Sequence, residues 1–318
     1  MDNKYPNIIL YNILKKYINK NEIKLNNIYN NFDNLYLINI KDIKESKENK
    51  NNENNENNEN NESDSDPWDL SINDDKFYIN NKIARIFPLL KNFSNFSKIK
   101  IDEDSFCYIT IREIADNISK IICHHLLEYN LNPQKINIAD YTSGVGGNVL
   151  SFSKYFKYVY AIEISEKRVE YLINNIEIYG YKNIKVINKC AIEFNNNNLI
   201  EKNLNVIFID PPWGGSNYKT NNSLVLNLGS IEIEKIIIDI TKKFSDHYIE
   251  LIKLNPKEKN NNYNNRFIVI KLPKNYDIEY FYNYIKNNNN SKYYIISSYL
   301  YILNKMLIIV CELQFVVK

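Results

Sequence analysis

Clusters of cysteine and histidine are missing from this sequence. It has four cysteines and three histidines among 318 residues, and no two cysteines have the C-x-x-C spacing. Zinc sites and disulfide frameworks need such residues at short, regular spacings, so we expect neither a metal site nor a disulfide framework. Scattered cysteines are also typical of a protein that works in a reducing compartment.

Long hydrophobic runs and a charge imbalance are absent as well. No stretch approaches the ~18 apolar residues of a membrane-spanning helix, and residues 1–17 mix charged with apolar side chains, unlike a signal peptide. We therefore expect a soluble intracellular protein with no membrane partner. The net charge is +2, from 40 basic and 38 acidic residues, so any contact with nucleic acid should be local.

Apolar residues disappear from residues 45–66, which contain only Asn, Glu, Lys, Ser and Asp. Such a segment cannot bury enough surface to offset the entropy cost of ordering, so we predict a disordered linker. Before it lies an N-terminal extension, residues 1–44, whose loosely helical pattern shows no motif. After it we predict a helical extension over residues 67–130, and then a main domain over residues 131–318.

The main domain begins with a pattern typical of nucleotide-binding α/β proteins. A strand over residues 136–141 leads into a glycine turn with Gly144 and Gly146, and a second strand ends at Glu163, nineteen residues beyond Gly144. Glycines let the backbone approach a ligand, and an acidic side chain at this spacing accepts ribose hydroxyls. A nicotinamide dehydrogenase shares these features, but Val149 replaces the third glycine of its fingerprint.

Strands and helices continue to alternate along the main domain. We expect helices over residues 109–129, with Thr110 as N-cap, and over 166–179, 231–251 and 277–285. Further strands are expected at residues 184–187, 206–209 and 267–272, followed by an antiparallel hairpin made of 293–303 and 306–317. This order predicts a seven-stranded, doubly wound, Rossmann-like sheet of the α/β class with an N-terminal helical extension.

The most distinctive segment is DPPWGG at residues 210–215, directly after the apolar strand 206–209. The carboxyl end of a parallel strand is where α/β proteins bind ligands. The two prolines stiffen the loop, so that Asp210 and Trp213 present a carboxylate and a flat ring beside each other, as needed to hold a planar base. The alternative is a proline turn with a buried tryptophan.

From about residue 99 to the C-terminus, the sequence resembles the trimethylguanosine synthase family of S-adenosylmethionine-dependent RNA cap methyltransferases. The resemblance is carried by DYTSGVGGN at 140–148, Glu163, NNIEIYG at 174–180 and PPWGG at 211–215. It extends to the segment 99–110, similar to the family's aromatic-rich segment over the methyl donor, and to LPKN at 272–275. The resemblance implies a class I methyltransferase fold for residues 131–318.

The resemblance implies S-adenosylmethionine as cofactor and 7-methylguanosine-capped RNA as substrate. Our interpretation assigns the donor to Phe106, Thr110, Asp140, Gly144, Gly146, Glu163, Cys190, Ala191 and Asp210. It assigns the cap to Trp213, Asn175, Lys76, Lys82, Arg85 and Lys274, and catalysis to Asp210, Pro211 and Trp213. For each basic residue, a solvated surface charge is the alternative. No metal is implied.

Three features depart from the family's pattern. Cys190 stands where these enzymes usually have Asp, so we expect backbone groups near Ala191 to contact the adenine. The segment 108–111 lacks the usual proline, and Lys274 replaces an arginine, which keeps the charge but loses the planar guanidinium.

Two alternatives stay open. An N-methyltransferase acting on guanine N2 or adenine N6 in other RNA also uses an Asp-Pro-Pro-aromatic loop. A non-catalytic cap-binding protein would keep Trp213, but Asp140, Gly144 and Glu163 are all present. The resemblance further implies a monomeric catalytic domain acting on small nuclear and small nucleolar RNAs, ribonucleoprotein partners, and the nucleus, with the cytoplasm as a second location.

Overall fold

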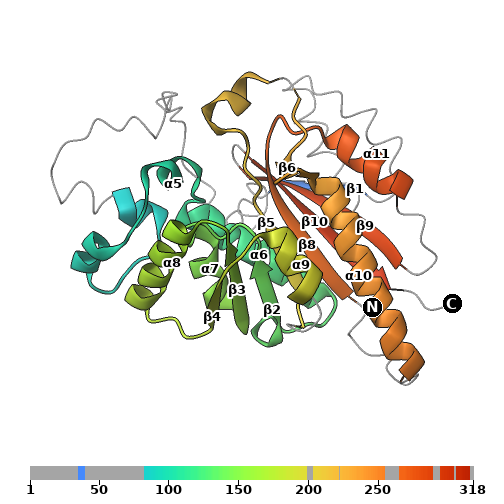
Figure 1. Ribbon diagram of the computed structural model, residues 1–318, viewed down its shortest axis with the longest axis horizontal. Helices are drawn as coiled ribbons and strands as arrows, with labels where there is room; N and C mark the ends of the chain where they lie inside the picture. Colours follow the sequence, from blue (N-terminus) through green and yellow to red (C-terminus); the bar gives the residue numbers. More distant parts are fainter. Residues whose placement is uncertain are drawn as a thin grey trace, which may run out of the picture.

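Helices cover both faces of one central sheet in this protein (Figure 1). The structure is a computed structural model. It describes residues 35–39, 82–198, 203–221, 223–254, 265–288, 294–303 and 306–315. The predicted linker 45–66 and Lys76 therefore lie outside the described residues.

The sheet has eight strands in the order β1-β9-β10-β8-β5-β2-β3-β4. Their bounds are β1 Leu35–Asn39, β2 Asn137–Asp140, β3 Tyr158–Glu163, β4 Ile184–Asn188, β5 Val206–Ile209, β8 Asn265–Pro273, β9 Tyr294–Leu303 and β10 Met306–Phe315. Strand β10 runs antiparallel to β8 and β9, whereas β2 to β5 and β8 pair in parallel. Without β1, this is the seven-stranded doubly wound sheet predicted from the sequence.

Strand β1 is an addition that the sequence pattern did not indicate. It pairs in parallel with β9, with Leu35 opposite Ser298 and Asn39 opposite Ile302. The N-terminal extension, interpreted above only as loosely helical, therefore contributes the eighth strand at the edge of the sheet.

The helices surround this sheet on both sides. Their bounds are α5 Glu103–Tyr108, α6 Arg112–Glu128, α7 Gly147–Tyr155, α8 Glu166–Tyr179, α9 Ala191–Asn198, α10 Ile233–Leu254 and α11 Ile278–Asn288, with 3-10 turns η1 Phe93–Lys98, η2 Pro133–Lys135 and η3 Gly215–Thr220. A short helical turn also covers residues 82–86, and a small hairpin joins β6 Asn227–Leu228 to β7 Ile231–Glu232. Helix α8 matches its prediction because Ser165 caps its first turn and Gly180, with φ +70°, ends it.

The helix predicted over residues 109–129 begins later, and Thr110 is not its cap. Residues Ile109 and Ile111 have extended backbones and separate α5 from α6, and Ile111 is the N-cap of α6 without a side-chain hydrogen bond. The hydroxyl of Thr110 instead accepts a hydrogen bond from Asn148 Nδ2 (3.1 Å). The extended residues bring this segment onto the glycine turn.

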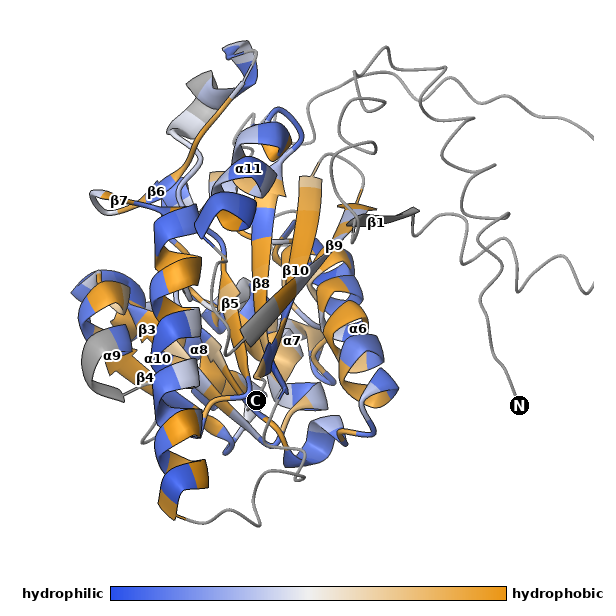
Figure 2. Ribbon diagram, turned by 90° about the vertical axis from the view of Figure 1, so that its right-hand side faces the viewer, coloured by the Kyte–Doolittle hydropathy of each residue, from blue (hydrophilic) through white to orange (hydrophobic). Residues whose placement is uncertain are grey.

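The hydrophobic core lies in two layers, one on each face of the sheet. Residues of α10 and α11 pack on one face, and residues of α6, α7 and α8 pack on the other. Figure 2 shows α10 and α6 on opposite sides of the strands. Because helices cover both faces, strand β5 is buried at every position, as its uninterrupted apolar sequence predicts.

Candidate active site

Four ionisable side chains lie at one edge of the sheet, where the parallel strands end. Asp140 ends β2, Glu163 ends β3, Asp210 directly follows β5, and Lys271 lies near the end of β8. The register continues this arrangement, since Ile209 lies opposite Ile270 and so brings Asp210 beside Lys271. Ligand sites of doubly wound proteins occur at this edge.

The glycine turn between β2 and α7 is shaped for close contact with a ligand. Gly144 and Gly146 have φ values of +53° and +111°, which other residues rarely adopt. A Cβ on Gly146 would also lie 2.9 Å from Leu172 Cδ1. Gly146 is the N-cap of α7 and makes no side-chain capping hydrogen bond, so the start of this helix offers backbone N–H groups.

Glu163 is fixed beside this turn. One carboxylate oxygen accepts a hydrogen bond from Gly144 N (2.9 Å), and the other accepts one from Ser165 N (2.8 Å). Each carboxylate oxygen can accept a further hydrogen bond, so Glu163 can still receive two ribose hydroxyls. The predicted pairing of Gly144 with Glu163 is thus a direct contact.

Asp140 is fully buried, and only half of its carboxylate has a partner. Its Oδ1 accepts a hydrogen bond from Thr142 N (3.0 Å), whereas Oδ2 has no partner among the described residues. Burial raises the pKa of Asp140 to about 8, and the carboxylates of Asp210 and Glu163 add to this rise. A buried, unpaired carboxylate oxygen at a ligand edge favours a cationic ligand group.

Asp210 is tied to the glycine turn and to β8. Its backbone N–H donates to Thr142 Oγ1 (2.8 Å), and Lys271 Nζ donates to its Oδ2 (2.6 Å). Burial raises the pKa of Asp210, and Lys271 and a hydrogen bond to Thr110 oppose that rise. The DPPW loop and the glycine turn therefore form one connected site.

Trp213 follows the two prolines of this loop. It is partly buried, and its ring packs edge-on against Tyr218, with ring centroids 5.2 Å apart. Lys271 Nζ lies 4.9 Å from the Trp213 ring centroid. Pro211 is buried and Pro212 is exposed, so the loop turns from the core toward solvent between them. Trp213 is neither wholly in the core nor free in solvent.

The segment before α6 closes over the glycine turn. A Cβ on Gly147 would lie 2.7 Å from Ile109 Cγ1 and 3.0 Å from the carbonyl oxygen of Thr110, so the two segments are in tight contact. Asp102 caps α5 through Ser105 and lies 3.5 Å from Arg168 on α8. Phe106 is partly buried on α5, in the segment predicted to lie over the donor.

Asn175 holds the structure together instead of facing a substrate. It is fully buried, its Oδ1 accepts from Lys100 N (2.8 Å), and its Nδ2 donates to Lys100 O and Val145 O (both 2.9 Å). With these partners and no exposure, its side chain has no access to the cap. The assignment of Asn175 to substrate binding is therefore corrected: it joins the 99–101 segment to the glycine turn.

Cys190 and Ala191 follow β4 and begin α9, beside the end of β3. Lys189 N donates to Glu163 O (3.1 Å), which places this turn next to the acidic residue. Cys190 is partly buried and Ala191 is buried. Both residues lie near Glu163, as contact with the adenine would require. This contact stays a prediction.

The proposed phosphate contacts come from two separate places. Lys82 and Arg85 lie on the helical turn 82–86, which is held by hydrogen bonds from Arg112 Nη1 to Ala84 O (3.0 Å) and from Tyr179 OH to Pro88 O (2.5 Å). Lys274 is exposed directly after β8. Their contacts with a cap triphosphate stay predictions.

Sequence reasoning missed Lys271, Thr142 and Asn275. The sequence could have indicated Lys271, because it is a charged residue near the end of the apolar run 267–272. Thr142 and Asn275 are ordinary turn residues, and only the structure shows that they hold the DPPW loop. Asn275 Nδ2 donates to the carbonyl oxygens of Tyr218 and Asn221, both at 2.7 Å.

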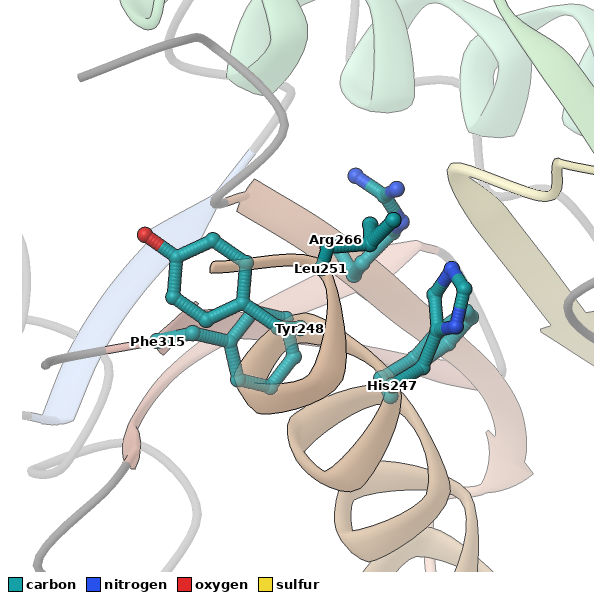
Figure 3. Close-up of a pocket in the computed structure, with 6 residues that line it drawn as sticks. His247, Tyr248, Leu251, Arg266 and Phe315 are labelled. Carbon is teal, nitrogen blue, oxygen red and sulfur yellow. The ribbon is translucent and has the colours of Figure 1, made fainter. Parts of the chain in front are cut away.

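A small hollow lies away from this edge, at the start of β8 (Figure 3). It is lined by Phe244, His247, Tyr248, Leu251, Arg266 and Phe315. The Arg266 guanidinium lies 5.6 Å from the Phe244 ring centroid. Since Arg266 and Lys271 are near opposite ends of β8, this hollow is separate from the candidate site.

The described part of the chain contains no group of three His, Cys, Asp or Glu residues placed to hold a metal ion. None of its helices is long and apolar enough to cross a membrane.

A family model for RNA cap guanine-N2 methyltransferases matches residues 135–314, which include the glycine turn, Glu163 and the DPPW loop. The chain belongs to this family. Its members are methyltransferases, and the matched residues include the connected site at the sheet edge.

Individual proteins are similar to parts of this chain. An uncharacterized protein of Acanthamoeba polyphaga mimivirus is 34% identical over 227 residues, covering 65% of this chain and 79% of that protein. The trimethylguanosine synthase of Schizosaccharomyces pombe is 30% identical over 139 residues, covering 42% of this chain and 55% of that one. A putative methyltransferase from Streptococcus mutans, solved with SAH, is 14% identical with a TM-score of 0.39, covering 61% of this chain and 97% of that one.

The residues present fit S-adenosylmethionine. The unpaired oxygen of Asp140 suits the ammonium group of its methionine part, and Glu163 suits its ribose. The glycine turn leaves the backbone open between them. The chain is therefore an S-adenosylmethionine-dependent methyltransferase.

Proposed function

We propose that this protein methylates the exocyclic N2 of a 7-methylguanosine cap on RNA. The observation that carries the proposal is the DPPW loop: Asp210 is bound to the glycine turn through Thr142, and Trp213 stands partly exposed beside it. A carboxylate and an aromatic ring on one stiff loop suit a planar base that has both hydrogen-bond donors and a face to stack.

Trp213 has the role of selecting the base. A 7-methylguanine is a cation, and its attraction to an indole face contributes ~1–2 kcal/mol when water is excluded. The edge contact with Tyr218 and the contact with Lys271 restrain the ring, so less side-chain entropy is lost when a base stacks on it. This favours a methylated over an unmethylated guanine.

Asp210 has the role of orienting N2. An exocyclic amine of guanine is a poor nucleophile, so most of the rate gain must come from positioning, which can supply ~7–11 kcal/mol. We expect the Asp210 carboxylate or the Pro211 carbonyl to hold the N2 hydrogens, with Asp210 able to accept the released proton. Bound S-adenosylmethionine supplies a methyl group activated by its sulfonium.

Small nuclear and small nucleolar RNAs, methylated in the nucleus, are the substrates we propose, on the strength of the family resemblance alone.

The proposal is tested by methyl transfer to 7-methylguanosine diphosphate beside guanosine diphosphate. We expect transfer to the former and ~5- to 30-fold less to the latter, because ~1–2 kcal/mol of cation–π attraction is lost. Nuclease digestion and mass spectrometry of the product should place the methyl group on N2. Equal transfer to both nucleotides, or transfer only to uncapped RNA, would overturn the proposal.

A further inference from the structure

Lys271 is a buried cation inside the candidate site. It is 3% exposed and follows four apolar residues of β8. Removing an ammonium group from water is costly unless a close partner of opposite charge compensates. Its partner is Asp210 Oδ2 at 2.6 Å, so this ion pair is an integral part of the site.

The same ammonium group also touches the second functional side chain of the loop. Its Nζ is 4.9 Å from the centroid of the Trp213 ring. Lys271 thus contacts both Asp210 and Trp213 from outside the loop. Since the ammonium is buried while Trp213 is partly exposed, Lys271 lies on the inner side and leaves the exposed part of the ring for a base.

We propose that Lys271 is a positioning residue that keeps Asp210 ionised and fixed beside Trp213, so that the carboxylate can accept the N2 hydrogens of the bound base. The proposal rests on the function proposed above for Asp210.

The charges around Asp210 explain why a counter-ion is needed there. Asp140 on β2 and Glu163 on β3 are carboxylates of the same edge, and the carboxylates of Asp210 and Glu163 both raise the pKa of Asp140. Burial raises the pKa of Asp210, and Lys271 is the largest influence that lowers it, followed by Thr110. Without Lys271, Asp210 would hold its proton to a higher pH and could no longer accept two hydrogen bonds from N2.

The first test is a carbon-13 NMR titration of the aspartate carboxylates, with Asp210→Asn to assign the signal. In the wild-type protein we expect Asp210 to be ionised at pH 7. This measurement involves neither RNA nor methyl donor, so it stands even if the substrate proposed above is wrong. An Asp210 that is protonated at pH 7 would overturn the role of Lys271.

The second test compares Lys271→Met, Lys271→Arg and the control Lys242→Met, an exposed lysine on α10. Lys271→Met keeps the length of the side chain without its charge, so the Asp210 titration should move up by at least about one pH unit. With 7-methylguanosine diphosphate, kcat/KM at pH 7 should fall at least ~10-fold and recover as the pH rises through the new pKa.

Lys271→Arg should keep the wild-type titration of Asp210, and Lys242→Met should match the wild type throughout. If Lys271→Met loses activity equally at all pH values and the Asp210 titration does not move, the substitution has only changed the structure. That result would refute the proposal. If this variant does not fold, the wild-type and Lys271→Arg titrations decide alone: protonation of Asp210 at pH 7 in either would refute it. Activity on guanosine diphosphate alone, with the shift present, would refute only the proposed cap substrate.

Discussion

Asp140, Glu163 and Asp210 are three carboxylates at one sheet edge whose surroundings differ. Glu163 accepts hydrogen bonds at both oxygens, Asp210 has the Lys271 ammonium, and Asp140 has an oxygen with no partner among the described residues. Different surroundings give side chains of one type different roles. Variants of single residues can therefore separate the donor side of the site from the substrate side.

Asp140 should release a proton when S-adenosylmethionine binds. Its pKa is raised from 3.8 to about 8, so at pH 7 the unliganded folded protein keeps the proton, and a cationic ligand beside the carboxylate expels it. Calorimetry at pH 7 in buffers of different ionisation enthalpy should detect this release in the wild type and not in Asp140→Asn. The same release in both proteins would contradict the contact.

The raised pKa of Asp140 also has a consequence for stability. Between pH 3.8 and about 8 the unfolded chain has lost this proton while the folded protein keeps it, so the stability of the unliganded fold falls as the pH rises through this window. Asp140→Asn should therefore melt higher than the wild type, by a margin that grows across the window.

Glu163→Ala should weaken the binding of S-adenosylmethionine strongly. The variant removes a charged acceptor for ribose hydroxyls, worth ~1.5–3 kcal/mol, and also the acceptor of the Gly144 and Ser165 N–H groups that shape the turn. Glu163→Gln is the matched variant: it keeps the shape, but its NH₂ group must face one of the two N–H donors. Calorimetry showing unchanged donor affinity in Glu163→Ala would contradict this role.

Trp213→Ala should abolish methyl transfer while donor binding survives, because the ring contacts Tyr218 and Lys271, on the proposed substrate side of the site. Trp213→Phe should keep part of the activity and discriminate less between 7-methylguanosine and guanosine diphosphates, since its ring attracts cations less. Melting temperature, donor affinity and turnover are measured on the same proteins. If the ring were only a core residue, Ala would leave a cavity costing ~3–5 kcal/mol and all three would fall together.

At the scale of elements, two segments hold the substrate side in place. The residues after β8 clamp the loop that follows Trp213, since Asn275 donates to Tyr218 O and Asn221 O and its own carbonyl accepts from Leu224 N (2.9 Å). Tyr218 in turn meets the edge of the Trp213 ring. The orientation of Trp213 thus depends on a segment about sixty residues later in the chain.

Asn275→Ala should raise the KM for 7-methylguanosine diphosphate and leave donor affinity unchanged. Two hydrogen bonds to the η3 loop are lost, each contributing ~0.5–1.5 kcal/mol, and Tyr218 is released from the Trp213 edge. Ser223→Ala is the control, because it removes a nearby exposed hydrogen bond, to Asp277, that does not hold Tyr218. Steady-state kinetics with both variants would show the difference, and an equal effect on donor and cap affinity would contradict it.

The elements that the sequence predicted are those with a strong local pattern. Helix α8, the apolar strands β5 and β8, and the hairpin of β9 and β10 are confirmed because burial on a fixed period leaves its mark in the residues. Strand β1 was not predicted, because its pairing with β9 joins residues more than 250 positions apart and leaves no local pattern. For the same reason the sequence did not predict the roles of Thr142 and Asn275, whose side chains bind segments remote in sequence. Asp210 and Trp213, in contrast, were predicted directly from the motif DPPWGG.

At the scale of the whole molecule, the N-terminal extension contributes one strand to the edge of the sheet. Strand β1 covers Ser298–Ile302 on the edge of β9. An uncovered strand edge offers unpaired backbone groups to other chains. The linker 45–66 has no apolar residue with which to enter a core.

Two deletions should therefore behave in opposite ways. Removing residues 45–66 leaves residues 40–44 and 67–81 between β1 and the helical turn 82–86, about 20 residues that can span roughly 65 Å when extended. Melting temperature and turnover should stay at wild-type values.

Removing residues 1–44 takes β1 away and exposes the β9 edge, so this protein should self-associate with rising concentration and melt lower. Sedimentation velocity over a concentration series checks both proteins. A 1–44 deletion that stays monomeric and as stable as the full chain would show that β1 does not cover the sheet in solution, and a linker deletion that loses turnover would show that residues 45–66 do more than connect.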